Sequence, residues 1–326
     1  MLLSEFLLQQ TRVDTALPYF QRFVTRWPSL EALAQASDEE VLGEWAGLGY
    51  YSRARRLLAC ARAAVDRGGL PSTAEALQAL PGVGPYTAGA IASIAFQQAV
   101  PLVDGNVERV LCRLDGERVD PRSVAGRRWV WARAHSLVSP DRPGDLNQAL
   151  MELGATVCSP KRPGCERCPL ASACVARAEG CQEELPALQA RTPPQPIEGV
   201  VIVWERDGQV LLGQRPSTGL LAGLWEPLSL WPSALSPEDA VRTCLAQELG
   251  AAPHTTRYAG ALTHVFSHRR LRLHVFAVDA VAPPLAAEGR GSYYADLRWV
   301  PVDAPSVPLS TLAKKALRLA ALGAQP

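Results

Sequence analysis

Four cysteines lie close together in the chain, in a stretch rich in proline, lysine and arginine. Cys158, Cys165, Cys168 and Cys174 form a C-x6-C-x2-C-x5-C pattern. Four thiolates at this spacing predict a metal centre, either iron–sulfur or zinc. Disulfides are the weaker alternative, because no charged-then-apolar leader indicates export. The pattern also departs from the two CxxC pairs that are typical of zinc ribbons.

A glycine-rich turn could bind an anion. The string Leu80-Pro-Gly-Val-Gly-Pro-Tyr-Thr-Ala-Gly89 lies between two helix-like stretches, 72–79 and 87–95. Gly82 and Gly84 allow a tight turn that exposes backbone N–H groups at the start of the next helix, where the helix dipole also favours negative charge. An ordinary helix–turn–helix is the alternative.

Two carboxylates are candidates for acid–base chemistry. Asp104 lies just before a helix-like run in Val103-Asp-Gly-Asn-Val-Glu-Arg-Val110, so an N-cap role is its simplest explanation. Glu5, alone, would be taken as a surface helix residue. Neither carboxylate predicts a reaction by itself.

The elements that must position these residues differ between the two halves of the chain. Residues 1 to about 180 show helical spacing, and the segments concerned are 30–46, 54–65, 87–96, 129–137 and 146–157. Short β-branched runs follow from Gly199, at 200–204, 210–213, 271–278 and 297–300, with a helix predicted at 236–249 between Ser236 and Gly250. The proline-rich segment 182–198 predicts an extended connector. We therefore predict a multi-domain protein, with an all-α domain followed by an α+β domain.

Composition sets limits without identifying a partner. The chain has 326 residues, 48% of them hydrophobic and 20% charged, and a formal net charge of +1, so any nucleic-acid site must be a local patch. No apolar run approaches the roughly 18 residues that a membrane helix needs. The scattered Cys60, Cys112, Cys181 and Cys244 are predicted to be buried small side chains.

Three motifs together resemble the MutY family of adenine DNA glycosylases. They are Leu3-Ser-Glu-Phe-Leu-Leu-Gln-Gln-Thr11, Gly47-Leu-Gly-Tyr-Tyr-Ser-Arg-Ala-Arg55 and the turn at 80–89, which is similar to a helix-hairpin-helix element. The resemblance covers nearly the entire chain. It implies removal of adenine mispaired with 8-oxoguanine or guanine in duplex DNA, a 4Fe-4S cluster on the four cysteines, and catalytic roles for Glu5, Asp104, Tyr86 and Asn106.

A lysine nucleophile of the endonuclease III type would occupy the position of Tyr86, so the resemblance favours a monofunctional hydrolytic glycosylase over a glycosylase/lyase. Relatives carry a further segment with a Pro-Trp-Arg stretch before the glutamate, and we expect this chain to be truncated there. A lesion-binding protein with weak catalysis is therefore the other alternative.

The resemblance also implies DNA contacts. Contacts with the mispair and its neighbouring bases are assigned to Gln10, Thr11, Leu48 and Tyr50. Contact with a phosphate is assigned to Gly82, Val83 and Gly84, and contact with 8-oxoguanine to Phe266, Ser267 and His268. Arg53, Arg55 and Arg56 would reach phosphates or line a solvated helix face. Lys161, Arg162 and Arg167 would form a basic loop organised by the cluster.

The second half resembles the Nudix-like domain of the same family. When the catalytic Nudix helix is aligned on Gly250, Thr243 and Cys244 occupy the positions of its Arg and Glu, and Gln247 replaces one of its two metal-binding acids. Glu248 is the single acid of that set that remains, so hydrolysis of nucleotides is not expected. The predicted domains are 1–181 for the glycosylase, 182–198 for the linker and 199–326 for 8-oxoguanine recognition. We expect a monomer that is cytoplasmic and DNA-associated, without a secretion signal or membrane segment.

Overall fold

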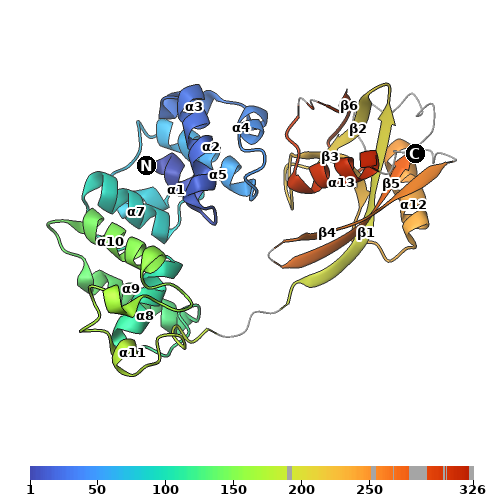
Figure 1. Cartoon of the computed structure of the whole chain (residues 1–326). Coiled ribbons are helices and arrows are strands. Elements are labelled where there is room, and N and C mark those ends of the chain that lie inside the picture. The colour runs from blue at the N-terminus through green and yellow to red at the C-terminus, as the bar shows by residue number, and fades with distance from the viewer. Residues whose placement is uncertain are drawn as a thin grey trace. The chain divides into compact units, whose positions relative to one another are not determined.

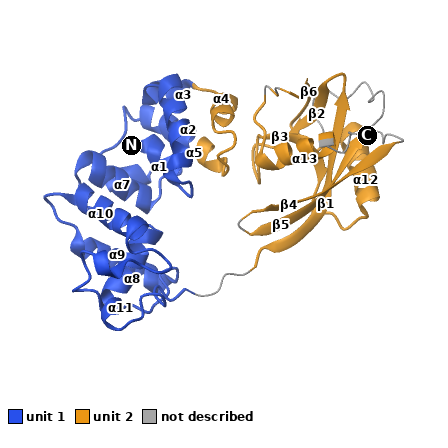
Figure 2. Cartoon of the chain, viewed as in Figure 1, with its two compact units in different colours: residues 1–35, 56–191 blue, residues 36–55, 192–326 orange. Residues whose placement is uncertain are grey.

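The computed structural model describes residues 1–188, 193–250, 255–266, 268–278, 292–303, 305 and 307–322. The chain forms two compact units, one of residues 1–35 and 56–191 and the other of residues 36–55 and 192–326 (Figure 2). Residues 36–55, from the helical half of the sequence, thus belong to the second unit. None of the helices in the described ranges is both long enough and apolar enough to cross a bilayer.

The helical half contains short and medium helices joined by tight turns (Figure 1). They are α1 (Leu2–Leu8), α2 (Val13–Arg26), α3 (Leu30–Gln35), α4 (Asp38–Glu44), α5 (Ser52–Val65), α6 (Ala74–Gln78), α7 (Pro85–Phe96), α8 (Gly105–Asp115), α9 (Val124–Leu137), α10 (Pro143–Thr156), the 3₁₀ turn η1 (Cys165–Arg167) and α11 (Val175–Ala178).

The helix predicted across 30–46 is two helices, and the reason is a capping box. Ser37 accepts a hydrogen bond from the Glu40 N–H at 3.2 Å, and the Glu40 carboxylate accepts one from the Ser37 N–H at 2.9 Å. This reciprocal pair satisfies the free donors of a new helix start, so α3 ends and α4 begins there.

The core of the first unit forms where α7, α8, α9 and α10 meet. Its buried side chains are Ala90, Leu102, Val103, Val107, Val110, Leu111, Cys112, Val130, Ala134 and Leu150. Helices α8 and α10 approach closely at Gly154, because a Cβ there would lie only 2.6 Å from the Cβ of Asn106. That approach fixes the start of α8, which carries Asp104 and Asn106, against α10.

The second unit is built around a six-stranded sheet with the order β4-β5-β1-β3-β2-β6. The strands are β1 (Gln195–Arg206), β2 (Gln209–Gln214), β3 (Trp225–Leu230), β4 (Thr256–Val265), β5 (Arg269–Val278) and β6 (Asp296–Pro301). Strands β1 and β5 are parallel, and the other pairs are antiparallel. Strand β1 begins inside the segment that was predicted as a connector, because residues 195–198 pair with β5.

Helices cover both faces of this sheet (Figure 1). Val201 and Val203 of β1 pack with α13 (Thr311–Leu322), whereas Val200 and Ile202 pack with α12 (Pro237–Leu249). Successive strand residues point to opposite faces, so a continuous apolar run fills two cores at once. Helix α12 has the predicted ends, since Ser236 caps its first turn and Gly250 ends it at φ +72°.

Candidate functional site

The Glu5 carboxyl is buried in the first unit. Glu5 lies on α1 with 7% of its surface exposed, and the adjacent Phe6 and Leu7 are also buried, whereas Leu8 is exposed. Burial raises the pKa of Glu5, and the nearby charge of Asp104 raises it further, while the Tyr86 hydroxyl opposes both effects. A carboxyl of this kind can hold a proton closer to neutral pH than an ordinary glutamate can.

Tyr86 lies beside that carboxyl, in the first turn of α7. Burial, followed by the Glu5 and Asp104 carboxylates, raises the pKa of Tyr86, so its hydroxyl keeps its proton. The hydroxyl approaches two acceptors, the Sδ of Met151 at 3.6 Å and the Glu5 carboxylate. The structure therefore places Glu5, Tyr86 and Asp104 within electrostatic reach of one another, although their elements are far apart in sequence.

Asp104 has the N-cap role that its position predicts. Its Oδ1 accepts hydrogen bonds from the backbone N–H groups of Asn106 at 2.9 Å and Val107 at 2.7 Å, and its Oδ2 accepts one from the Asn106 side-chain amide at 2.9 Å. The carboxylate of Asp104 thus accepts three hydrogen bonds at the start of α8. The N-cap interpretation and the catalytic interpretation are thus compatible.

Two buried arginines connect this helix to the cysteine loop, and the sequence analysis did not single them out. Arg109 donates to Asn106 Oδ1 at 2.9 Å and to three backbone oxygens, those of Gly105, Gly154 and Cys158. One turn later Arg113 donates to the backbone oxygens of Leu185, Cys158, Ser159 and Pro160 and, at 3.3 Å, to the Cys158 Sγ. The only sequence signal was the placement of two arginines four residues apart on an amphipathic helix.

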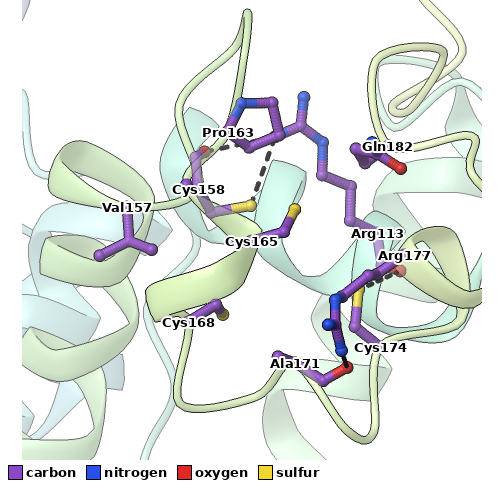
Figure 3. A pocket seen from close by; sticks show the side chains of 11 residues that line it. Arg113, Val157, Cys158, Pro163, Cys165, Cys168, Ala171, Cys174, Arg177 and Gln182 are labelled. Atoms are coloured by element: carbon purple, nitrogen blue, oxygen red, sulfur yellow. Dashed lines mark hydrogen bonds between the residues drawn. The ribbon is translucent and has the colours of Figure 1, made fainter.

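The four cysteines of the sequence pattern line one pocket (Figure 3). Burial raises the pKa of Cys165, and the sulfurs of Cys174, Cys158 and Cys168 raise it further, so four thiolates would need a cationic centre to coexist. The N–H···S hydrogen bond from Arg113 is the kind that supports a thiolate ligand. The donor set therefore fits a thiolate-bound metal centre. Among the described residues, no group of three or more His, Cys, Asp or Glu side chains is arranged to hold a single metal ion.

The remaining four cysteines are buried, as predicted. Burial raises the pKa of Cys60 to about 11 and the pKa of Cys112 and Cys244 to about 12. Within the loop itself, Lys161 and Arg162 are exposed, and Arg167 is also exposed but donates to the Thr156 oxygen at 2.8 Å.

The glycine-rich turn joins α6 to α7. Gly82 has φ +77°, Gly84 caps α7, and Pro85 occupies its first turn. Gly82 and Gly84 are exposed, whereas Val83 is buried and anchors the turn. A side chain at Gly82 would also collide with Arg56, whose Cβ lies 2.6 Å from the position of an added Cβ. The turn thus leaves its backbone accessible at a helix N-terminus.

Two loops carry non-glycine residues with left-handed backbone. Gln10, after α1, has φ +57° and is exposed, with Thr11 half-buried beside it. Tyr50, between α4 and α5, has φ +48° and is 52% exposed, while Leu48 is buried.

The arginines after this loop differ from the prediction. Arg53 is neither on a solvated face nor free to reach a phosphate, because it is 5% exposed and lies over the rings of Trp45 and Tyr50. Desolvation lowers the pKa of Arg53 to about 10. Arg55 is half-buried and Arg56 is exposed.

The predicted recognition loop lies at the tip of the β4–β5 hairpin in the second unit. Phe266 and Arg269 close the tip, with the Phe266 N–H donating to the Arg269 oxygen at 2.8 Å. Phe266 packs edge-to-face on His264 at 4.7 Å, and His268 is exposed. Ser267 lies outside the described residues.

Helix α12 lacks the arrangement of a Nudix metal site. Cys244 is buried in the core, where it packs with Ala240, Val241 and Leu245. Glu248, the single acid that the alignment retains, accepts hydrogen bonds from the Tyr293 N–H at 3.0 and 3.2 Å. Cys244 and Glu248 therefore have structural contacts in the second unit.

Comparisons with known proteins match both halves. Residues 3–133 match the HhH-GPD superfamily of base excision DNA repair proteins, and residues 199–319 match the NUDIX domain. Adenine DNA glycosylase of Homo sapiens is 44% identical over 84% of this chain and 60% of its own length, and that of Mus musculus is 40% identical over 97% and 70%. A solved thermostable thymine-DNA glycosylase is 28% identical, with a TM-score of 0.50 over 55% of this chain and 83% of its own. The chain thus spans less than two thirds of the human relative.

Proposed function

Because this chain belongs to the adenine DNA glycosylase family, we propose that it removes adenine from duplex DNA where adenine is mispaired with 8-oxoguanine or guanine. The observation that carries the proposal is the buried Glu5 carboxyl, whose pKa is raised next to Tyr86 and Asp104. A proton donor beside a second carboxylate is the arrangement that hydrolysis of a sugar bond requires.

In this mechanism the adenine leaves the base stack before the reaction, at a cost of a few kcal/mol. Protonated Glu5 donates its proton to adenine N7 as the bond between N9 and the sugar C1′ breaks, so the bonding electrons leave with a neutral base. Water then adds to C1′, and its proton passes to the Glu5 carboxylate. The raised pKa of Glu5 favours the first step, because it keeps the acid protonated nearer to neutral pH.

Asp104 stabilises the positive charge that develops on the sugar. Its hydrogen bonds from Asn106 and Val107 hold the carboxylate in place, and Asn106 and Tyr86 orient the two carboxylates. The position of a lysine nucleophile is occupied by Tyr86, so a monofunctional hydrolytic reaction follows.

Several DNA contacts of the family map onto exposed residues, whereas Leu48 and Val83 are buried. The backbone at 82–84 would bind a phosphate without reading sequence. Gln10, Thr11, Leu48 and Tyr50 would fill the space at the mispair, with Tyr50 already exposed for stacking. Phe266, Ser267 and His268 would contact 8-oxoguanine. Residues 1–181 would then be the glycosylase domain, 182–198 the linker and 199–326 the recognition domain.

The four cysteines would hold a 4Fe-4S cluster. Cys158, Cys165, Cys168 and Cys174 supply four thiolates, which is the usual ligand set, and Arg113 supports the first of them. Bound there, the cluster would supply structure and charge to the loop that carries Lys161, Arg162 and Arg167, and the reaction itself requires no redox step.

Excision kinetics of Glu5→Gln test the proposal. In single-turnover incubations with a duplex containing 8-oxoguanine opposite adenine, the unaltered chain should release free adenine and leave an alkali-labile site. Glu5→Gln should abolish excision and leave binding nearly intact. Glu108→Gln is the matched control, because burial and Asp104 also raise the pKa of Glu108, and it should excise within about threefold of the unaltered chain.

Three results would contradict the proposal. Tight binding by the unaltered chain without release of adenine would indicate a lesion-binding protein. Strand breaks without alkali, trapped by borohydride, would indicate a lyase. Full turnover by Glu5→Gln would refute the assignment of the acid.

A further inference from the structure

The loop that presents Tyr50 is held in a constrained conformation. It joins α4 to α5 and has positive φ at Gly47 (+100°), Gly49 (+76°) and Tyr50 (+48°). A tyrosine adopts this backbone only where its neighbours enforce it. The Gly49 carbonyl accepts hydrogen bonds from Trp45 Nε1 at 3.0 Å and Arg53 Nη2 at 3.3 Å. The loop is therefore positioned from its base, while the Tyr50 ring remains exposed.

The next residue, Tyr51, connects the loop to the Nudix-like fold within the second unit. The Tyr51 side chain is buried, and its hydroxyl accepts a hydrogen bond from the Gly47 N–H at 3.2 Å. The same hydroxyl donates to the Leu309 carbonyl oxygen at 3.2 Å. One group thus closes the loop and ties it to a residue more than 250 positions away in the sequence.

The acceptor belongs to ordered β-structure. Leu309 forms a parallel bridge with Trp225, the first residue of β3, and the Trp225 N–H donates to the Pro308 oxygen at 3.0 Å. A carbonyl fixed in this way can transmit a displacement of the strand to the Tyr51 hydroxyl, whereas a carbonyl in a free loop would absorb the displacement.

A second contact lies on the same part of the fold. Arg55, one helical turn after Tyr51, places its Nη2 2.5 Å from where a Cβ of Gly223 would be, and Gly223 has φ +63°. Only a glycine leaves room for the guanidinium and adopts this backbone without strain. Arg55 therefore lies against the segment that leads into β3, while Tyr51 binds Leu309, which is bridged to the first residue of β3.

We propose that the Tyr51 hydroxyl is a positioning contact that couples the Nudix-like fold to the loop bearing Tyr50, and so determines specificity for the base opposite adenine. The inference rests on the proposed function. The loop and the β4–β5 hairpin belong to the same unit, and under this inference a base held at the hairpin would also help to fix the backbone from which Tyr50 stacks. Without the hydroxyl, contacts to the lesion would no longer help to place Tyr50.

Tyr51→Phe in the full chain tests this coupling, because it removes the hydroxyl and keeps the buried ring. The readout is the ratio of single-turnover excision rates on 8-oxoguanine:adenine and guanine:adenine duplexes. We expect the ratio to fall about three- to tenfold, as is typical of losing one hydrogen bond, mainly through slower excision opposite 8-oxoguanine. Tyr258→Phe is the control, since that exposed hydroxyl interacts only with His274 among the described contacts, and its ratio should not change.

An unchanged ratio in Tyr51→Phe would overturn the inference. An equal fall on both duplexes would also overturn it, because a hydroxyl that only braces Gly47 would affect both substrates alike. Gly223→Ala displaces Arg55 and leaves Tyr51 intact, so a fall in the ratio as large as that of Tyr51→Phe would show that the hydroxyl is not the coupling contact and would also overturn the inference.

Binding measurements separate the inference from the proposed function. If the unaltered chain releases no adenine, the proposed function fails, and the ratio of dissociation constants for the same two duplexes then tests the coupling. That ratio should move closer to one in Tyr51→Phe and stay constant in Tyr258→Phe. The coupling would be refuted if the ratio of dissociation constants moved equally in both variants, or if it changed in neither variant.

Discussion

Replacing Arg109 with methionine should destabilise the first unit and slow excision together. The guanidinium donates four hydrogen bonds, to Asn106 Oδ1 and to the oxygens of Gly105, Gly154 and Cys158, at 2.7 to 3.2 Å. Methionine keeps an apolar stem of similar length and removes all four donors. The acceptors include buried carbonyls that water cannot easily reach.

The expected loss of unfolding free energy is about 3–5 kcal/mol. Four hydrogen bonds of roughly 1 kcal/mol each give this value, and it also matches the cost of removing one partner from a buried charged network. For a unit of this size the loss corresponds to a fall in Tm of about 10 °C. The catalytic effect arises because Asn106 loses its anchor and so orients Asp104 less well, which should slow excision about 10- to 100-fold.

Thermal unfolding and single-turnover excision on the same preparation check both values. Arg133→Met is the control, since Arg133 pairs with Asp115 near the other end of α8 with both side chains partly exposed, and that change should cost at most about 1 kcal/mol. Arg109→Lys should recover part of both losses. If the Tm and the excision rate of Arg109→Met equal those of the control, the four hydrogen bonds of Arg109 do not position the Asp104 carboxylate.

Three further predictions follow from the site. The pKa of Glu5 is higher in the folded chain than its unfolded value of 4.5, so the unaltered carboxyl stabilises the fold most below pH 4.5 and less as pH rises. The Glu5→Gln variant lacks this titration. Its stability relative to the unaltered chain should therefore increase from acidic to neutral pH in denaturant titrations. Gly82→Ala should cost about 1–2 kcal/mol, from its φ of +77° and the contact with Arg56, and should weaken DNA binding in equilibrium titrations. Arg162→Ala should weaken binding evenly across DNA sequences and reduce the salt-dependence slope by about 1.

Elements with strong local signals were predictable. Helix α12 carries its own start and stop, a serine N-cap and a terminal glycine, and it has the predicted ends. Strand β3 was missed, because Pro227 lies in its middle, paired with Leu212, and a proline argues against a strand when only the sequence is read. The β1 strand begins earlier than predicted, since Pro196 lies near its first residue, where the missing N–H is tolerated.

The carboxylates and cysteines could be found from the sequence, but the arginines that connect them could not. Arg109 and Arg113 bind backbone oxygens that lie up to 72 positions away, and every residue has a backbone oxygen. No residue type at the partner positions therefore signals the contact. Arg53 was placed wrongly for a related reason, because a stacking partner such as Trp45 is decided by packing and not by spacing.

Left-handed backbone at non-glycine residues is a feature that the sequence did not predict. Six non-glycine residues in the described ranges have positive φ: Gln10, Tyr50, Gln97, Arg162, Asp207 and Leu221. Gln97 ends a helix and Asp207 begins a hairpin turn, where such backbone is ordinary. Three of the other four lie in segments that the motifs assigned to DNA. Gln10 directly follows the C-cap of α1, where a left-handed residue is also ordinary, whereas Tyr50 and Arg162 lie in loops and are exposed. At Tyr50 the cause is local, because Trp45 and Arg53 both donate hydrogen bonds to the carbonyl of the preceding Gly49 and so hold the loop in this conformation.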